Sequence, residues 1–320
     1  MVVGVDEAAG LLRSGGVVAF PTETVYGLGA VARDEPAVRR VFEIKGRPPS
    51  NPLIVHATGE SMARGCCDAW PTAVSMLAGA FWPGPLTLVL PKAGWVSDAV
   101  TAGGATVAVR VPDQPVALDL IERVGLPLVG PSANPSGRLS PTRAEHVAEA
   151  FGERVAVVDG GPCRVGIEST VLDLASGPPR ILRPGVLGAD AIARVLGTPV
   201  ESHAAAGEPG VGSPGLVGPH YRPRTPLVLA GTLGQLDARL RGAASAVVLS
   251  PPGASLAVDP PHASIAMPGD AAAYARELYA ALREADAMSP TLIVACWPGG
   301  DSATWRAIEE RLERAAEGTR

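Results

Sequence analysis

The chain has 320 residues, of which 47% are hydrophobic, and it carries a formal net charge of −5. This length leaves room for two domains with separate cores, and the hydrophobic content excludes a disordered protein. The acidic balance argues against a protein built mainly to hold nucleic acid, which is expected to be basic on at least one face.

The sequence also indicates the cellular compartment in which the protein is found. No apolar run reaches the roughly 18 residues needed to cross a bilayer, and the first ten residues lack the basic region of a secretory signal. The chain has four cysteines, Cys66, Cys67, Cys163 and Cys296, and their spacing is that of neither a zinc site nor a redox-active pair. We therefore expect a cytoplasmic protein with reduced thiols. The histidines are scattered, so their spacing implies no metal site.

The chain begins with a predicted helix over residues 6–14 and a buried strand over residues 17–20. Pro21 ends this strand because proline cannot donate a hydrogen bond to a neighbouring strand. The turn that follows carries three polar residues, Thr22, Glu23 and Thr24. Glu23 suits either a helix end or a cation, and the pattern does not decide between them.

A second cluster of polar residues follows soon afterwards. A predicted helix over residues 37–44 ends at a loop that contains Gly and Pro and carries Lys45 and Arg47. The next predicted strand, residues 53–56, ends at His56. Two cations on a stiff loop near a group of hydroxyls suit a polyanionic ligand with a small polar partner.

Strands and helices alternate up to about residue 200. We expect helix 62–80 with a turn or break at Pro71, strand 86–90, strand 106–111, helix 116–124, strand 126–129, a hairpin of strands 169–174 and 180–183, and helix 186–196. The loop after strand 126–129 is rich in Ser, Asn, Pro and Gly and offers Ser132, Asn134 and Ser140. Strand ends of open α/β sheets are where ligands usually bind.

The second half of the chain has a different composition. Residues 201–226 are rich in Gly, Pro and Ala without an apolar period, which predicts a linker. Residues 227–320 then alternate strand and helix in a small Rossmann-like pattern, with strands at 227–229, 247–249 and 292–295. This part lacks the G-x-G-x-x-G turn, so the pattern indicates no dinucleotide site.

The sequence contains neither a phosphate-binding G-x-x-x-x-G-K-[ST] loop nor a recognisable Ser/His/Asp or Cys/His arrangement. The remaining polar candidates are four cations and seven hydroxyl or amide side chains: Lys45, Arg47, Arg110 and Arg183, with Thr22, Thr24, Asn51, Ser132, Asn134, Ser140 and Ser169. Reactions at phosphate need little beyond positioning and charge stabilisation. An adenylating enzyme without a protein nucleophile is therefore chemically reasonable.

Three stretches resemble the signatures of the YrdC-type domain of threonylcarbamoyl-AMP synthases. The first combines Pro-Thr-Glu-Thr-x-Tyr-Gly-Leu at 21–28, Lys-x-Arg-Pro at 45–48 and Asn-Pro-Leu at 51–53. The second is Pro-Ser-Ala-Asn at 131–134 with Ser-Pro-Thr at 140–142, and the third joins residues 166–171 to Leu-Arg-Pro-Gly at 182–185. The last part of the chain resembles, more weakly, the C-terminal domain of the two-domain members.

The linker carries part of the same resemblance. Two-domain members have a Ser-Pro-Gly segment and a His-Tyr pair there, which correspond to Ser213-Pro214-Gly215 and His220-Tyr221. Residues 216–219 depart from the family pattern. Tyr221 is either a lid contact to the nucleotide or a hydrophobic anchor to the domain face.

The resemblance implies an α/β architecture in three parts. Residues 1–200 would form a YrdC-like twisted sheet domain with an open central cleft, residues 201–226 a linker that folds over the cleft, and residues 227–320 a smaller Rossmann-like domain. The implied activity converts L-threonine, bicarbonate and ATP to threonylcarbamoyl-AMP and pyrophosphate, which makes the chain a nucleotidyltransferase. The product would pass to a tRNA-modifying transferase for threonylcarbamoyladenosine formation.

The same resemblance assigns roles to individual residues. The L-threonine pocket would contain Thr22, His56, Thr101, Arg110 and Ser169, with Arg110 as the candidate for the carboxylate. ATP would contact Lys45, Arg47, Asn51, Ser132, Asn134, Ser140, Arg183 and Tyr221. Lys45 and Arg47 would serve catalysis by holding phosphates. Mg²⁺ would bridge the phosphates of ATP, largely through water and without ligands from the protein.

Two alternatives stay open on the sequence. The cation set suits an RNA-binding module, or weak RNA binding beside catalysis, but the acidic net charge and the 4% aromatic content speak against a dedicated one. A carbamoyl-transfer enzyme would use the same domain on another substrate.

Overall fold

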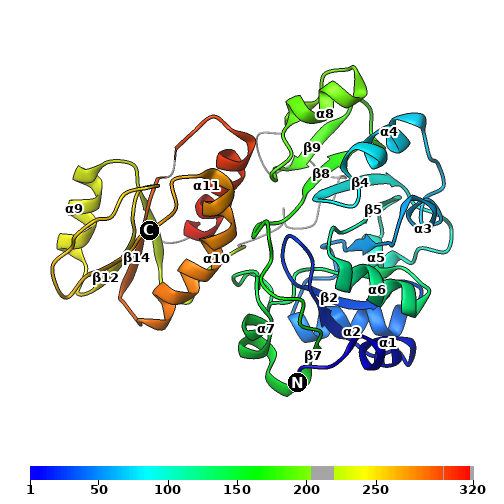
Figure 1. Cartoon of the computed structure of the whole chain (residues 1–320), viewed down its shortest axis with the longest axis horizontal. Helices are drawn as coiled ribbons and strands as arrows, with labels where there is room; N and C mark the ends of the chain where they lie inside the picture. Colours follow the sequence, from blue (N-terminus) through cyan, green and yellow to red (C-terminus); the bar gives the residue numbers. More distant parts are fainter. Residues whose placement is uncertain (203–219, 298, 318–320) are drawn as a thin grey trace.

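The computed structural model describes residues 1–202, 220–297 and 299–317, and two β-sheets organise this part of the chain (Figure 1). The strands of the larger sheet are β1 (Val18–Phe20), β2 (Gly27–Val31), β3 (Ile54–His56), β4 (Leu86–Pro91), β5 (Thr106–Arg110), β6 (Leu128–Val129), β7 (Ala156–Val157), β8 (Thr170–Asp173), β9 (Arg180–Arg183) and β10 (Glu201–Ser202). They pair in the order β10-β9-β8-β4-β5-β3-β6-β2-β1-β7, with both parallel and antiparallel neighbours.

Helices accompany this sheet along the chain. They are α1 (Val5–Arg13), α2 (Glu35–Lys45), α3 (Glu60–Arg64), α4 (Thr72–Phe81), α5 (Asp98–Thr101), α6 (Pro115–Val124), α7 (Ala144–Phe151), the 3₁₀ turn η1 (Gly152–Arg154) and α8 (Ala189–Leu196). Helix α2 begins where the Asp34 side chain accepts a hydrogen bond from the Ala37 N–H, and it ends at Gly46 in the left-handed conformation.

The two faces of the central strands differ. One face buries Val55, Leu88 and Val109 in the main core together with residues of α2 and α4. On the opposite face, strand residues alone form a small apolar cluster, Ile54, Val89, Ala108, Val171 and Leu182. Because side chains alternate along a strand, His56 and Arg110 lie on this second face, beside Ile54 and Ala108.

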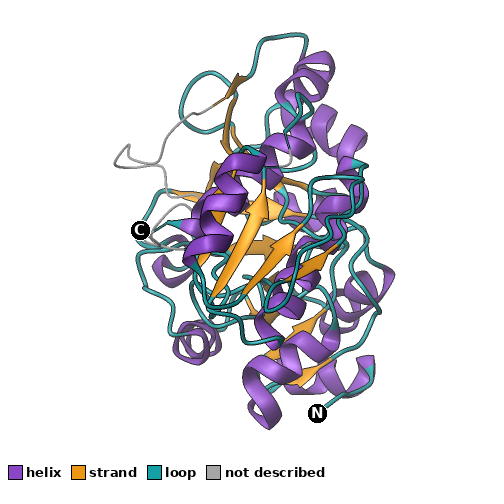
Figure 2. Cartoon of the chain, turned by 90° about the vertical axis from the view of Figure 1, so that its left-hand side faces the viewer, coloured by secondary structure: helices purple, strands orange, loops and turns teal. Residues whose placement is uncertain are grey.

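The smaller sheet is parallel throughout and follows in the chain after residue 226. Its strands are β11 (Leu227–Ala230), β12 (Ala246–Leu249), β13 (Ala263–Ile265) and β14 (Leu292–Cys296), in the order β11-β14-β12-β13. Helix α9 (Leu233–Gly242) packs on one face, whereas α10 (Ala271–Ala287) and α11 (Ala303–Ala316) pack on the other (Figure 1). Figure 2 views the molecule from the side of this half and shows a helix in front of the strands. Helices on both faces of a parallel sheet make this half Rossmann-like.

Helices α10 and α11 also join the two halves, and they lie between the two sheets in Figure 1. Val25, Leu139 and Ile167 from the first half share one buried cluster with residues of α10 and α11. The contact is close at Gly166, where an added Cβ would lie 2.3 Å from Cα of Arg276 in α10.

The α/β class and the two predicted architectures are confirmed, with local corrections. The predicted helix 62–80 is two helices, α3 and α4, because the chain breaks between Arg64 and Thr72, around Pro71. The predicted strand 126–129 pairs only at Leu128–Val129. The sequence did not predict β2, whose glycines weaken the strand signal, nor β7, α7, β10 and β13.

The linker prediction falls mostly outside the described residues. This includes Ser213-Pro214-Gly215 and residues 216–219. The predicted boundaries near residues 200 and 226 stay a prediction. Among the described helices, none combines the length and the apolar character that crossing a membrane requires.

Candidate active site

A cavity opens on the face of the large sheet that carries His56 and Arg110. Its walls bring together residues from all three signatures and from the end of the linker. Eight predicted site residues line it, namely Thr22, Arg47, His56, Arg110, Ser132, Ser169, Arg183 and Tyr221. The cavity therefore combines cations with hydroxyl groups, as the sequence predicted for a polyanionic ligand and a small polar partner.

The turn after β1 is fixed by its own side chains. The Thr22 hydroxyl accepts hydrogen bonds from the N–H groups of Thr24 and Val25, each at 3.2 Å, and donates to the Val25 carbonyl at 2.6 Å. Thr22 Oγ1 and Thr24 Oγ1 lie 2.9 Å apart. Such local bonds hold the hydroxyls of a turn in place, so this part of the wall is preorganised.

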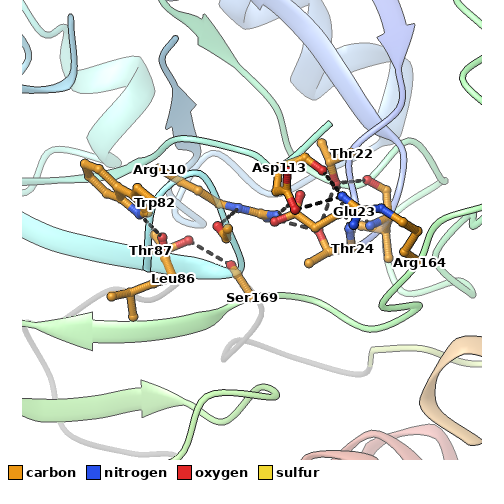
Figure 3. Close-up of polar contacts among 12 residues, drawn as sticks. Thr22, Glu23, Thr24, Trp82, Leu86, Thr87, Arg110, Asp113, Arg164 and Ser169 are labelled. Atoms are coloured by element: carbon orange, nitrogen blue, oxygen red, sulfur yellow. Dashed lines mark hydrogen bonds and ion pairs between the residues drawn. The ribbon is translucent and has the colours of Figure 1, made fainter. Parts of the chain in front are cut away.

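Arg110 extends from the end of β5 toward this turn (Figure 3). Its Nη1 donates to Thr24 Oγ1 at 3.0 Å, and its Nη2 lies 2.6 Å from Glu23 Oε2 in a buried ion pair. Nε donates to the Gly84 carbonyl at 3.2 Å. Glu23, for which the sequence left two interpretations, therefore holds a cation. Arg110 is fixed in orientation before any ligand binds.

His56 lies at the end of β3 on the same face. Burial and the charge of Arg110 lower the pKa of His56 to about 3, so its ring is neutral near pH 7. Nδ1 is buried without a hydrogen-bond partner among the described residues. An added Cβ at Gly130 would lie 2.8 Å from Nδ1, so only glycine lets the main chain pass this close to the ring. A neutral imidazole with an unused ring nitrogen suits a ligand hydroxyl or amine.

Two further arginines line the cavity. Arg47 donates from Nε to the Asn51 carbonyl at 3.1 Å and from Nη2 to the Pro52 carbonyl at 2.9 Å. Arg183 donates from Nε to the Ser169 carbonyl at 3.1 Å and from Nη2 to Ser169 Oγ at 3.1 Å. Burial, together with the charge of Arg183, lowers the pKa of Arg47 to about 10. Two like charges in one cavity favour a polyanion.

Glu168 and Tyr221 complete the wall near the second half of the chain. Ser140 donates to Glu168 Oε1 at 2.6 Å, and Tyr279 of α10 donates to Oε2 at 3.0 Å. Tyr221 has a positive φ of 61° and stacks on Tyr279, with ring centroids 5.8 Å apart. It therefore lines the cavity and is also anchored to the second half.

Within the described ranges, no group of three His, Cys, Asp or Glu residues is arranged to hold a metal ion. The carboxylate that lines the cavity, Glu168, already accepts hydrogen bonds on both oxygens.

Comparison with known proteins places this site in a family. The profile of the Sua5/YciO/YrdC family, described as telomere recombination, matches residues 10–185, more than half of the chain. This chain belongs to the Sua5/YciO/YrdC family. A second profile, described as the threonylcarbamoyl-AMP synthase C-terminal domain, matches residues 188–317. The chain thus has the two-part organisation of Sua5-type threonylcarbamoyl-AMP synthases.

Relatives agree with this assignment. The threonylcarbamoyl-AMP synthase of Pyrococcus abyssi is 49% identical over 226 residues, which are 69% of this chain and 66% of the relative. The enzyme of the same name from Bacillus subtilis is 48% identical over 229 residues, 70% of this chain and 66% of the relative. These alignments thus span just under two thirds of the relatives. A crystal structure of P. abyssi Sua5 complexed with L-threonine is similar with a TM-score of 0.89 and 40% identity, covering 98% of this chain and 94% of the other.

Five residues that the Sua5 resemblance assigned to the site do not line the cavity. Lys45 is buried and donates to the carbonyls of Ser132 and Asn134, so it fixes the loop that carries the second signature. Asn51 contributes its carbonyl to Arg47, and Ser140 bonds Glu168. Asn134 lines a separate hollow at the junction of the two halves.

Thr101 also lies apart from the other threonine-pocket candidates. It lines a separate hollow, with Val89 and Ala108. These two residues pack with Ile54, which lines the main cavity, so the two hollows lie on the same face of the sheet. Thr101 Oγ1 lies 3.3 Å from Lys92 Nζ, which donates to it.

Sequence reasoning gave no role to several residues of this Sua5-type site. Thr24 was only one of a set of hydroxyls, and Glu168 was noted only within the third signature, whereas both line the cavity. Tyr279 and Arg311 were missed altogether because they reach Glu168 from helices more than 100 residues away.

Proposed function

We propose that this chain is an L-threonylcarbamoyladenylate synthase, which converts L-threonine, bicarbonate and ATP to threonylcarbamoyl-AMP and pyrophosphate and is thus a nucleotidyltransferase. The observation that carries the proposal is the single cavity in which a small polar pocket adjoins two arginines. The names of the relatives and the L-threonine complex of P. abyssi Sua5 support it.

In this proposal L-threonine binds beside the turn after β1. The Thr22 and Ser169 hydroxyls and the His56 ring offer hydrogen bonds, while Arg110 supplies a fixed positive charge for the carboxylate. Because Glu23 already pairs with Arg110, the guanidinium is oriented before the substrate arrives. Thr101 lines a separate hollow on the same face of the sheet.

ATP would place its phosphates between Arg47 and Arg183, with Ser132 and Tyr221 on the same wall. Lys45, Asn51 and Ser140 would act through the residues that they hold, and Asn134 from the adjoining hollow. Mg²⁺ would enter with ATP, because phosphate oxygens and water are the ligands that this ion prefers.

The proposed chemistry needs charge stabilisation more than acid–base catalysis. The threonine amine and bicarbonate form a carbamate with loss of water. A carbamate oxygen then attacks the α-phosphorus of ATP, and the bond to the β-phosphate breaks to release pyrophosphate. The carbamate is already an anion, so Arg47 and Arg183 would mainly stabilise the charge that develops on the phosphates. With a pKa of about 3, His56 is a poor base near pH 7 and acts as a hydrogen-bonding group.

The product would serve tRNA threonylcarbamoyladenosine formation through a tRNA-modifying transferase. We expect the protein in the cytoplasm, where the four cysteines, all free in the structure, stay reduced.

The test is an assay of pyrophosphate release from ATP by the purified full-length chain. Release should require both L-threonine and bicarbonate, and the product should be threonylcarbamoyl-AMP by mass spectrometry. Equal release without L-threonine would contradict the proposal. Product formation from carbamoyl phosphate in place of threonine and bicarbonate would instead favour a carbamoyl-transfer enzyme.

A further inference from the structure

A buried carboxylate lies in the wall of a cavity that otherwise carries positive charge. Glu168 lines this cavity with Arg47 and Arg183. A free carboxylate at this position would repel a polyanion, or would compete with it for Arg183. The residues that hold Glu168 therefore affect what the cavity can bind.

The second half of the chain supplies the opposing charge. Arg311 of α11 places Nε 3.2 Å from Glu168 Oε2, and its side chain is 1% exposed. Its Nη1 donates to the Pro184 carbonyl at 2.7 Å, just beyond Arg183 in the chain. Its guanidinium carbon also lies 5.5 Å from the ring centroid of Tyr221, which lines the cavity. Arg311 thus contacts two residues of the cavity wall from the outside.

Several groups set the charge of Glu168. Arg311 approaches from α11 with Glu310 beside it, Arg183 from β9, Tyr279 from α10, and Tyr221 from the segment before β11. Burial alone would raise the pKa of Glu168, but the charges of Arg311 and Arg183 and the hydrogen bond from Ser140 outweigh it and lower the pKa. Glu168 is therefore an anion near neutral pH.

We propose that Arg311 is a positioning residue of the active site, which neutralises Glu168 and holds its carboxylate on the protein side, so that Glu168 does not compete with the phosphates of ATP for Arg47 and Arg183. The C-terminal half thereby sets the charge of a cavity built mainly by the N-terminal half. This inference rests on the proposed binding of ATP in this cavity.

Two single variants separate this role from a purely structural one. In Arg311→Met the carboxylate loses its partner, and the dissociation constant of ATP should rise about tenfold or more at pH 8, the scale of one uncompensated charge near phosphate. In Glu168→Gln the repelling charge is absent, and ATP should bind at least as tightly as in the wild type. If the ion pair between Arg311 and Glu168 only held the structure together, both variants would bind ATP more weakly than the wild type.

The pH dependence gives a second signature. Without Arg311, one of the charges that oppose the effect of burial is lost, so the pKa of Glu168 rises. As the pH falls through this raised pKa, Glu168 takes up a proton and loses its charge. The ratio of the ATP dissociation constants of Arg311→Met and wild type should therefore decrease as the pH falls through this raised pKa. A ratio that stays constant over the whole pH range in which both proteins are folded would contradict the proposal.

The double variant Arg311→Met/Glu168→Gln keeps the test decisive if the single Arg311 variant fails to fold. Replacing both members of a buried ion pair is often neutral for folding, whereas removing one member is costly. The double variant should bind ATP within about threefold of the wild type by titration calorimetry. An affinity as low as that expected for Arg311→Met would overturn the proposal.

Binding to the wild type distinguishes failure of the proposed function from failure of the role of Arg311. If the wild-type chain binds neither ATP nor pyrophosphate, the proposed function fails. If it binds ATP and Arg311→Met binds equally well at pH 8, only the role of Arg311 is overturned.

Discussion

Arg47 and Lys45 lie two residues apart, yet they contact different parts of the site. Arg47 lines the cavity, whereas Lys45 is buried behind it and bonds the main chain of the loop that carries Ser132. Burial, with the charge of Arg47, lowers the pKa of Lys45 well below its ordinary value. We therefore expect separable effects of these two residues, of Arg47 on ATP binding and of Lys45 on the loop.

Arg47→Ala should reduce kcat/KM for ATP by about 10²-fold, the loss typical of one charged group that stabilises a transition state. Lys45→Ala should instead lower the free energy of unfolding by about 2–3 kcal/mol, because two buried carbonyls lose their donor. Initial rates and urea denaturation of both variants check this. Arg39→Ala, an exposed residue of the same helix, is the control and should change neither quantity. Unchanged turnover in Arg47→Ala would remove the phosphate-binding assignment.

His56 predicts a pH dependence of stability. Its pKa is about 3 in the folded chain and about 6.5 in the unfolded chain. Between these pH values the unfolded chain binds more protons at His56 than the folded chain does. The contribution of the neutral, buried ring to the free energy of unfolding is therefore fully present above about pH 6.5 and decreases as the pH falls. The slope from this one group is about 1.4 kcal/mol per pH unit.

Urea denaturation of wild type and His56→Asn between pH 7 and pH 4.5 measures that contribution as a difference. The variant should lose less stability on acidification than the wild type. His146, whose pKa burial and nearby arginines lower to about 4, acts in the same direction in both proteins and cancels. Identical pH slopes would show that His56 is not buried as a neutral ring.

At the scale of elements, the third signature is held against α10. Gly166 has a φ of +83°, and an added Cβ would lie 2.3 Å from Arg276 Cα and 2.5 Å from the Ala275 carbonyl oxygen. Gly125 has a similar φ of +75° but has no atom within 4 Å of that position. The two glycines therefore share the backbone requirement and differ in the contact with α10.

Gly125→Ala should lower the free energy of unfolding by about 1–2 kcal/mol from backbone strain alone. Gly166→Ala should lose about 1–3 kcal/mol more, because the methyl group forces the Glu168 loop and α10 apart. Thermal and urea denaturation compare the two. Equal losses in the two variants would mean that the segment around Gly166 can move away from α10 without a cost in stability.

The sequence predicted elements well where hydrophobic periodicity was strong. Strands 86–90, 106–111 and 292–295 appear at nearly the predicted positions. It missed β2, because Gly27 and Gly29 interrupt the apolar pattern. The fold needs these glycines, since an added Cβ at Gly29 would lie 2.9 Å from the Phe20 ring. The requirement comes from tertiary packing, which local propensity does not report.

The site, like the fold, could be predicted from the sequence only where short local motifs mark its residues. Short motifs identified Thr22, Arg47 and Arg183, which do share a cavity. The partner of Glu168 could not be read in this way, because Arg311 belongs to an ordinary amphipathic helix 143 residues further along the chain. Only the packing of α11 on the first half makes that arginine part of the site.

On the scale of the whole molecule, the two halves share a core and one polar network. Val25, Leu139 and Ile167 are buried against α10 and α11, and Glu168 is bonded from both helices. Residues of the first half therefore form most of the cavity wall, and α10 and α11 of the second half hold part of that wall in place. This arrangement brings side chains of the C-terminal half into direct contact with a residue of the cavity wall.

The most direct test is a crystal structure of the full-length chain with L-threonine and a non-hydrolysable ATP analogue. The account predicts both ligands in the one cavity, with the threonine carboxylate near Arg110, the phosphates between Arg47 and Arg183, and Glu168 still paired with Arg311. Ligands in separate sites, or phosphates bound away from Arg47 and Arg183, would contradict it.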